Sequence, residues 1–200
     1  MEAPRQTWSH GQSSQPGGRP GSAQSALQPA SVHLRLKLAT RIDHRGVDRS
    51  LSRFDLGQPT GYAAFLDLNL AALNTLRPHW RSVDEADFAG MGDALAADLA
   101  ALGMEPSGEI DPVPGPIDGL GLAYVVRGSR LGSKILRKRV GHGLPTGYFD
   151  FRLAKPWARL LDQVDLRGAA GSEDELALFS GARATFAVYA RLAHTPEVGA

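Results

Sequence analysis

The chain has 200 residues, no cysteine, and 22 Lys and Arg against 21 Asp and Glu, for a net charge of +1. This length suits one domain with an ordinary core, and so balanced a charge gives no overall field for nucleic acid or an anionic membrane. The lack of cysteine excludes disulfides, thiolate catalysis, zinc–thiolate sites and iron–sulfur clusters. A bound metal must use histidine or oxygen ligands, or arrive inside a cofactor.

The ends of the chain differ in composition from its middle. Residues 1–30 are rich in Gln, Ser, Gly and Pro, so we expect a disordered tail, followed by one domain over 31–195 and a short tail over 196–200. The N-terminus lacks the apolar core of a secretion signal. No stretch approaches the roughly 20 apolar residues of a membrane span. We therefore expect a cytoplasmic protein with no membrane or nucleic-acid partner.

Helical spacing of apolar residues dominates the rest of the chain. It predicts helices over about 32–45, 60–76, 82–103 and 118–139, from about 156, and from 172 to beyond 189. The first is ambiguous, because apolar residues initially alternate as in a strand. The sequence thus predicts an all-α fold.

Helix signals support these boundaries. Thr60 can cap the second helix, and Pro78 stops it. Two capping boxes, Ser82 with Glu85 and Ser172 with Glu175, open later helices. Gly103 closes the helix that begins at Ser82.

The predicted helix over 118–139 contains Gly121, Gly128 and Gly132. Each interior glycine costs roughly 1 kcal/mol relative to alanine. Gly128 and Gly132 are four residues apart, so they share one face. Two interpretations are open: close packing of another helix, or a backbone surface lying against a planar cofactor with room for a small ligand.

His44 follows a helical run that carries Lys37 and Arg41 on its own face. An imidazole can ligate iron, and either basic residue could meet the carboxylates of a cofactor. The alternative is a surface histidine beside a solvated basic face.

These features together resemble those of a known family. The run 36–44, with Thr40 four residues before His44, resembles the proximal helix of heme oxygenases. The run Gly128-Ser129-Arg130-Leu131-Gly132-Ser133 resembles their distal glycine motif, especially in the bacterial, phytochrome-associated group. Phe179 and Phe186 match aromatic positions of the family. The resemblance covers about 32–193.

The resemblance implies a multi-helical heme oxygenase-like bundle with heme between a proximal and a distal helix. The iron ligand would be His44, and the propionates would meet Lys37 and Arg41. Leu131 and Phe179 would line the heme, and the catalytic distal segment would comprise Gly128, Ser129 and Gly132. Heme, as both cofactor and substrate, would be cleaved to biliverdin, carbon monoxide and iron. Electrons would come from a ferredoxin, a reductase or ascorbate, and a bacteriophytochrome could accept the bilin.

The sequence departs from the family pattern at two distal positions. Ser129 stands where many members have an aspartate that holds the proton-delivering water network, and a hydroxyl holds no negative charge. Ser133 replaces a frequent third glycine. A non-catalytic heme- or bilin-binding protein of the same fold is therefore an alternative, and a heme-free helical interaction domain is another.

Two sets of basic residues have open roles. On a later helix the candidates for propionate contacts are Arg152, Lys155 and Arg159. A cluster at a helix end could dock an acidic electron donor or be simply solvated; it comprises Lys134, Arg137, Lys138 and Arg139.

Overall fold

The computed structural model describes residues 31–108, 113–167 and 171–194. These residues contain helices and no strand, which confirms the all-α prediction for this part of the chain. The elements are α1 Val32–Ala39, α2 Arg41–Leu51, α3 Pro59–Leu76, the 3₁₀ helix η1 Arg77–His79, α4 Ser82–Ala101, α5 Gly119–Arg137, α6 Gly147–Asp150, α7 Trp157–Asp165 and α8 Glu173–His194. None of these helices combines the length and apolarity needed to cross a bilayer. The predicted tails, 1–30 and 196–200, lie outside the described residues.

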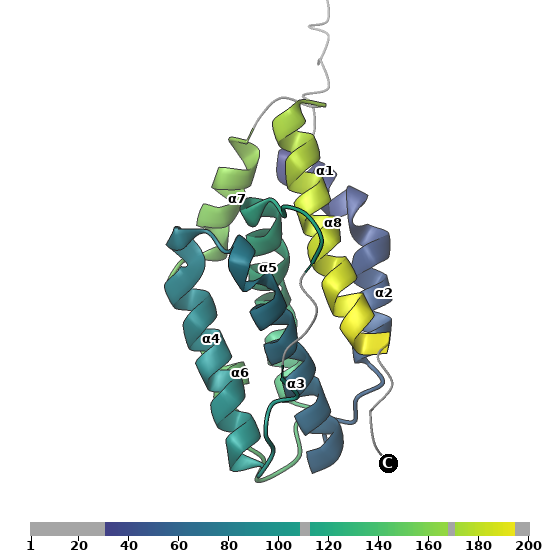
Figure 1. Cartoon of the computed structure of the whole chain (residues 1–200), viewed down its shortest axis with the longest axis vertical. Coiled ribbons are helices and arrows are strands. Elements are labelled where there is room, and N and C mark those ends of the chain that lie inside the picture. Colours follow the sequence, from purple (N-terminus) through teal and green to yellow (C-terminus); the bar gives the residue numbers. More distant parts are fainter. Residues whose placement is uncertain (1–30, 109–112, 168–170, 195–200) are drawn as a thin grey trace, which may run out of the picture.

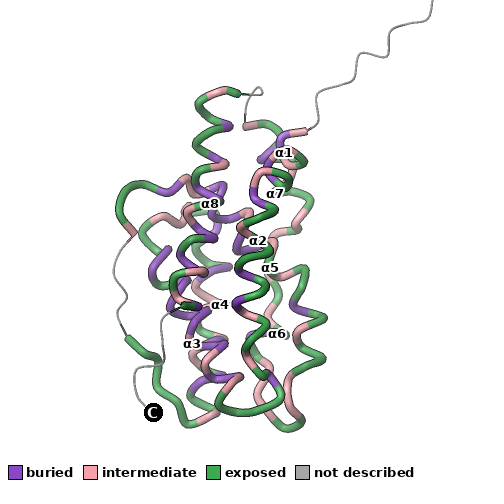
Figure 2. The backbone as a smooth tube through the Cα atoms, turned by 90° about the vertical axis from the view of Figure 1, so that its right-hand side faces the viewer, coloured by how far each residue is buried: buried purple, intermediate pink, exposed green. Residues whose placement is uncertain are grey.

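The long helices pack side by side (Figure 1). Helix α8 packs on α2, α3 and α5, and α4 covers the other side of α3. Helix α7 packs on α1 and α5 near one end of the bundle. Most of α3 is buried, whereas α2 buries only Val47 and Ser50, and Figure 2 shows this contrast between interior and outer elements. Helix α2 is therefore peripheral.

Helices α5 and α8 approach most closely at a pair of glycines. A Cβ atom on Gly121 would lie 2.3 Å from the carbonyl oxygen of Leu178, and one on Gly181 would lie 2.7 Å from the carbonyl oxygen of Asp118. Both obstacles are backbone atoms, which cannot move aside as a flexible side chain can. Close packing of α5 against α8 therefore requires a glycine at position 121.

The N-terminal helices run parallel to α8. Near the start of both, Arg35 pairs with Glu175 at 2.6 Å. Near the end of both, Arg53 donates a hydrogen bond to the carbonyl oxygen of Ala193. This parallel alignment fixes which residues of α1 and α2 lie at the same height along α8.

The prediction of one continuous helix over 32–45 is wrong. The chain bends at Thr40, whose backbone leaves helical geometry at φ −100° and ψ 4°. The Thr40 hydroxyl donates to the carbonyl oxygen of Leu36 at 2.8 Å. A threonine that bonds back to the preceding turn bends a helix. The result is two helices, α1 and α2, with His44 on the second.

The helix caps differ from the prediction in two places. Thr60 does not cap α3, because Pro59 occupies the first helical position, where its missing N–H costs nothing. Ser82 does not cap α4, because it lies inside the helix and Arg81 precedes it. The closure at Gly103 is confirmed, with φ +71°. Helix α6 and η1 were not predicted, because segments of 4 and 3 residues are too short to show the repeating apolar spacing of a helix.

Only one of the two hydrogen bonds expected for the capping box of Ser172 and Glu175 forms. The backbone N–H of Glu175 donates to the Ser172 hydroxyl at 3.2 Å, but the Glu175 carboxylate accepts from the N–H of Gly171 and pairs with Arg35. The Gly171 hydrogen bond is the main factor that holds the pKa of Glu175 below its ordinary 4.5; burial opposes it, and Arg35 adds to it. The carboxylate thus joins α8 to α1.

Acid is expected to weaken this link. Because the folded-state pKa of Glu175 is depressed, its contribution to stability is complete above the ordinary value of 4.5 and is lost as the pH falls through the folded value. Urea unfolding between pH 7 and pH 3 should give Glu175→Gln a lower stability at pH 7 and a shallower acid decline than the parent. The exposed Glu173→Gln is the control and should keep the parent's profile. Equal acid slopes for Glu175→Gln and the parent would contradict the assignment.

Candidate functional site

Two of the three glycines inside α5 are not required by packing within the described structure. A Cβ atom on Gly128 would meet the ring of Trp157 at 3.4 Å, an ordinary van der Waals contact, and one on Gly132 would meet no atom within 4 Å. Gly121, on the same helix, would clash with backbone. Close helix packing therefore does not explain Gly132, and it explains Gly128 only weakly.

The same face of α5 is apolar and uncovered. Leu131 is 61% exposed and Ile135 is 70% exposed. Together with Gly128 and Gly132 they follow the three- and four-residue spacing of one helix face. The described residues leave this glycine and aliphatic face open, although an exposed apolar stripe is costly in water.

His44 lies on α2 with one ring nitrogen engaged. Its Nδ1 is 3.0 Å from a carboxylate oxygen of Asp48, and its ring meets Phe186 of α8 edge-on at a centroid distance of 5.7 Å. No partner for Nε2 is found among the described residues, and the side chain is 60% exposed. A carboxylate on one nitrogen and an open second nitrogen is the usual arrangement of a metal-ligating histidine.

His44 lies at the edge of the contact between α2 and α8. Its ring meets Phe186, which is only 6% exposed, but its own side chain is 60% exposed. The neighbouring Asp43, 3.9 Å from Arg183, has a side chain that is 39% exposed. The imidazole therefore has one side against α8 and is otherwise open to solvent.

His44 and the α5 glycines lie at similar heights along α8. Helices α5 and α8 are in contact at Gly121 and Gly181. With a helical rise of about 1.5 Å per residue, Gly128 lies about 10 Å beyond Gly121 along α5, and Phe186 lies about 8 Å beyond Gly181 along α8. His44 lies beside Phe186. Helices α2 and α5 both pack on α8 and flank it in Figure 1. His44 and the open face of α5 thus lie at a similar height, with α8 between their two helices.

The other predicted contact residues are placed as follows. Lys37 ends α1 and Arg41 begins α2, so the bend at Thr40 lies between them, and both are exposed. Phe179 is half-buried near the start of α8. The structure thus brings His44 and Phe186 into contact, but it shows no contact of Lys37, Arg41 or Phe179 with them.

Ser129 is exposed, and its hydroxyl is engaged within its own helix. The hydroxyl donates to the carbonyl oxygen of Val126 at 2.8 Å. Its proton is thus directed at backbone, while the oxygen lone pairs stay open to accept a hydrogen bond. Ser133, at the predicted third glycine position, is buried.

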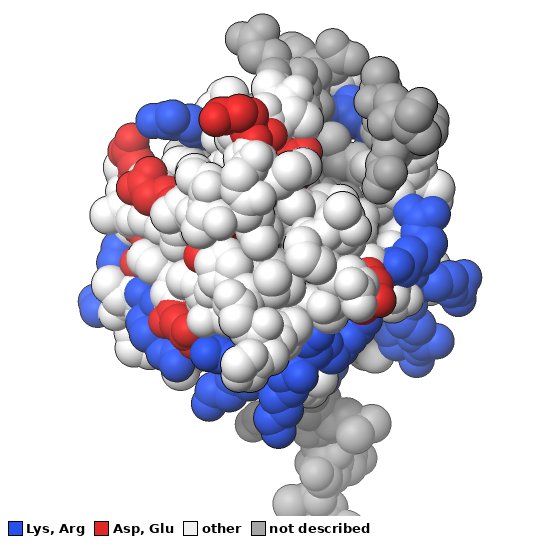
Figure 3. Space-filling view, turned by 90° about the horizontal axis from the view of Figure 1, so that it is seen from below, with Lys and Arg blue, Asp and Glu red and all other residues white. Residues whose placement is uncertain are grey.

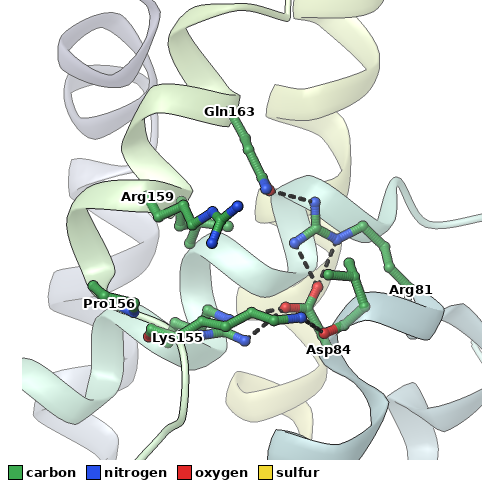
Figure 4. Close-up of a pocket in the computed structure, with 9 residues that line it drawn as sticks. Arg81, Asp84, Lys155, Pro156, Arg159 and Gln163 are labelled. Carbon is green, nitrogen blue, oxygen red and sulfur yellow. Dashed lines mark hydrogen bonds and ion pairs between the residues drawn. The ribbon is translucent and has the colours of Figure 1, made fainter.

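A buried ion network that the sequence did not reveal lies on another side of α5. The guanidinium of Arg127 meets Asp84 at 2.8 Å and Asp87 at 2.6 Å, and Arg81 also pairs with Asp84. The side chains of Arg127 and Asp84 are 2% and 1% exposed. Figure 4 shows Arg81 between Asp84 and Gln163 of α7, to which it donates at 3.0 Å. The network joins α4, α5 and α7.

A second buried carboxylate holds α6. Asp98 accepts hydrogen bonds from the backbone N–H groups of Gly147 and Tyr148, at 3.0 and 2.9 Å. Tyr62 donates to the same carboxylate at 3.4 Å. Burial raises the pKa of Tyr62 well above its usual value, and the charge of Asp98 adds to the effect. This cluster serves the fold.

Other described histidines serve the fold as well. His33 Nδ1 lies 2.6 Å from Asp165, and His79 accepts from the backbone N–H of Ile117 at 3.3 Å. Within the described part of the chain, no three His, Asp or Glu side chains gather as a metal site.

Two members of the basic cluster predicted to dock an electron donor, at the end of α5, contact other residues of the chain. Arg137 pairs with Asp150 at 2.8 Å, and Arg139 donates to the carbonyl oxygen of Phe54. Lys134 and Lys138 are exposed. Viewed from this end of the molecule, most Lys and Arg side chains lie along one half of the rim (Figure 3).

Comparison of the sequence with models of known protein families gives no match, and no curated protein matches it.

Proposed function

We propose that this chain is a heme oxygenase, which cleaves heme to biliverdin, carbon monoxide and iron with dioxygen and an external electron donor. The observation that carries the proposal is the open face at Gly132. Gly132 interrupts the exposed second half of α5 at a cost, and no atom of the described structure occupies the space that its missing side chain leaves. A ligand that lies flat against the backbone accounts for that cost.

The types of residue present suit a heme and support the proposal. Gly132 and Gly128 leave the backbone of α5 accessible, Leu131 and Ile135 offer apolar contact, and His44 has a free Nε2. When bound, heme supplies the iron that binds dioxygen and the porphyrin ring that is oxidised. His44 would hold the iron, and the carboxylate of Asp48 would fix the orientation of the imidazole ring. The exposed charges of Lys37 and Arg41 are available to the propionates.

The protein's further tasks are orientation and proton supply. The glycine face leaves room for a small ligand and for water, and adjoining side chains restrict where the ligand can lean. Because Ser129 donates to Val126, protons would be delivered by water, with the Ser129 oxygen accepting a hydrogen bond from that water.

The same hydrogen bond favours a second candidate function, a non-catalytic heme- or bilin-binding protein of this fold. A carboxylate at position 129 would hold a water network by its charge, whereas the hydroxyl present is committed to the carbonyl oxygen of Val126. Binding would then survive without turnover.

Hemin titration tests the site. The parent protein is expected to give the Soret band of histidine-ligated heme, and His44→Ala should weaken binding at least tenfold and lose that spectrum. His142→Ala, which removes another exposed imidazole, is the matched control and should behave like the parent. A His44→Ala variant that binds hemin with the parent's affinity and spectrum would refute the heme site.

A turnover assay distinguishes a heme oxygenase from a non-catalytic heme-binding protein. With ascorbate or a ferredoxin system added under air, a heme oxygenase converts bound heme to green biliverdin, which absorbance and product analysis identify. Histidine-ligated heme that stays intact would instead support the binding protein. A hemin spectrum unchanged by the protein would indicate a heme-free domain.

A further inference from the structure

A groove runs along a different side of α5, next to the segment that leads from α6 into α7. It has a volume of about 250 Å³, slightly below the roughly 300–1,000 Å³ of typical small-molecule sites, so it suits a small ligand. Its lining comprises Arg127, Arg130, Leu131, Ser133, Lys134, Phe151, Arg152, Leu153, Lys155, Pro156 and Trp157. On α5 the groove residues 127, 130 and 134 share a face that is rotated away from Gly128 and Gly132. The groove therefore adjoins the proposed heme face, with which it shares Leu131, but its cations lie on a different face of α5.

The groove is cationic, because its lining holds five basic side chains and no acidic one. Arg127 is neutralised from behind by Asp84 and Asp87. Within the described residues Lys134 has no ion-pair or hydrogen-bond partner, and Lys155 donates to the backbone carbonyl of Val83. These charges are therefore not balanced by acidic groups in the groove.

Arg130 has a buried nitrogen without a partner. Its Nη2 donates to backbone carbonyls, the nearest being that of Tyr148 at 2.8 Å, and its guanidinium lies 4.5 Å from the centroid of the Tyr148 ring. Its Nη1 is buried, and no described group accepts a hydrogen bond from it. A buried guanidinium N–H without an acceptor is costly, so an anionic oxygen in the groove would relieve it.

The apolar part of the lining defines the rest of the ligand. Trp157 and Phe151 contribute aromatic rings, and Leu131 and Leu153 contribute aliphatic contact. Trp157 is held in place by Tyr124, at a ring-centroid distance of 5.4 Å. Aromatic walls beside fixed cations suit a molecule with a flat apolar body and an acidic group.

We propose that this groove between α5 and residues 151–157 is a second ligand site, which binds a flat amphipathic anion. The apolar body would lie against Trp157 and Leu131, and the carboxylate, sulfonate or phosphate would meet Arg130, Lys134 and Arg152. The site does not depend on heme and stands on the groove residues alone.

The test uses anilinonaphthalene sulfonate, a fluorescent flat anion, with the full-length protein. The folded parent is expected to bind it with an increase in fluorescence, and the double variant Lys134→Gln, Arg152→Gln should bind it about tenfold more weakly, since two partly screened charge contacts are lost. The double variant Lys138→Gln, Arg139→Gln removes two cations of the same helix end that do not line the groove, and it should bind like the parent. Thermal unfolding by circular dichroism verifies that each variant is folded.

Two further measurements test where the sulfonate binds and whether binding requires its negative charge. The uncharged analogue phenylnaphthylamine should bind the parent at least tenfold more weakly than the sulfonate, and Gly132→Leu should leave sulfonate binding unchanged. Equal affinity of the charged and uncharged probes, equal loss in both double variants, no fluorescence increase with the parent, or loss of binding in Gly132→Leu would each overturn the proposal.

Discussion

Replacing Gly121 by alanine is expected to destabilise the fold by about 2–3 kcal/mol, the usual cost of overpacking at a close contact. The added Cβ would lie 2.3 Å from the carbonyl oxygen of Leu178 and 2.7 Å from the amide nitrogen of Ala182, so α8 must move away from α5. Urea unfolding followed by far-UV circular dichroism measures the loss. Stability equal to the parent's would show that α5 and α8 do not meet at Gly121.

Gly132→Ala is the matched control on the same helix. Its Cβ meets nothing within 4 Å, so better helix propensity should stabilise the fold by up to about 1 kcal/mol. The same position separates stability from function. Gly132→Leu should stay folded but lower hemin affinity more than tenfold, because its side chain would occupy the proposed heme face. A Gly132→Leu variant with the parent's hemin affinity would contradict the proposed binding face, although not the fold.

Arg127→Met is the second change with a large expected effect, a loss of about 3–5 kcal/mol in the free energy of unfolding. Methionine fills similar volume but leaves Asp84 and Asp87 buried without their shared cation. Asp84 keeps Arg81, and Asp87 keeps the backbone N–H of Ala154 at 2.8 Å. Neither remaining partner replaces the bridging charge.

The exposed pair of Arg137 and Asp150 provides the comparison. Their side chains are 47% and 49% exposed, so Arg137→Met should cost less than about 1 kcal/mol. Adding Asp87→Asn to Arg127→Met should recover part of the loss, because one of the unpaired charges is removed. Equal stability of Arg127→Met and Arg137→Met would show that the buried network does not hold α4 against α5.

Periodicity and helix signals predicted most of the fold. The long runs of α3, α4, α5 and α8 were recognised because each has several turns of apolar spacing. The bend at Thr40 was missed, because a hydroxyl bond to the preceding turn leaves no mark on the hydrophobic pattern. The capping role of Thr60 was wrong because Pro59 is itself suited to the first helical turn.

The candidate site was predicted only in part, and for a different reason. The glycine spacing of α5 identified an unusual face, and the structure distinguishes Gly121, which packing requires, from Gly132, which it does not. The buried position of Arg127 was not predicted, because an arginine in a helix is most often solvated. Its place directly after the apolar pair Val125 and Val126 was the available signal. Which acids it meets depends on contacts between distant parts of the chain.

The bend at Thr40 gives the two N-terminal helices separate attachments to the bundle. Helix α1 is fastened by two carboxylates, Asp165 bonded to His33 and Glu175 bonded to Arg35, whereas α2 rests on α8 through Val47 and the ring contact of Phe186. As the pH falls through the depressed pKa values of these two carboxylates, their attachments weaken while the apolar ones persist. Amide protons of α1 would therefore exchange with solvent before those of α2, so the first helix could open while the imidazole at position 44 kept its place.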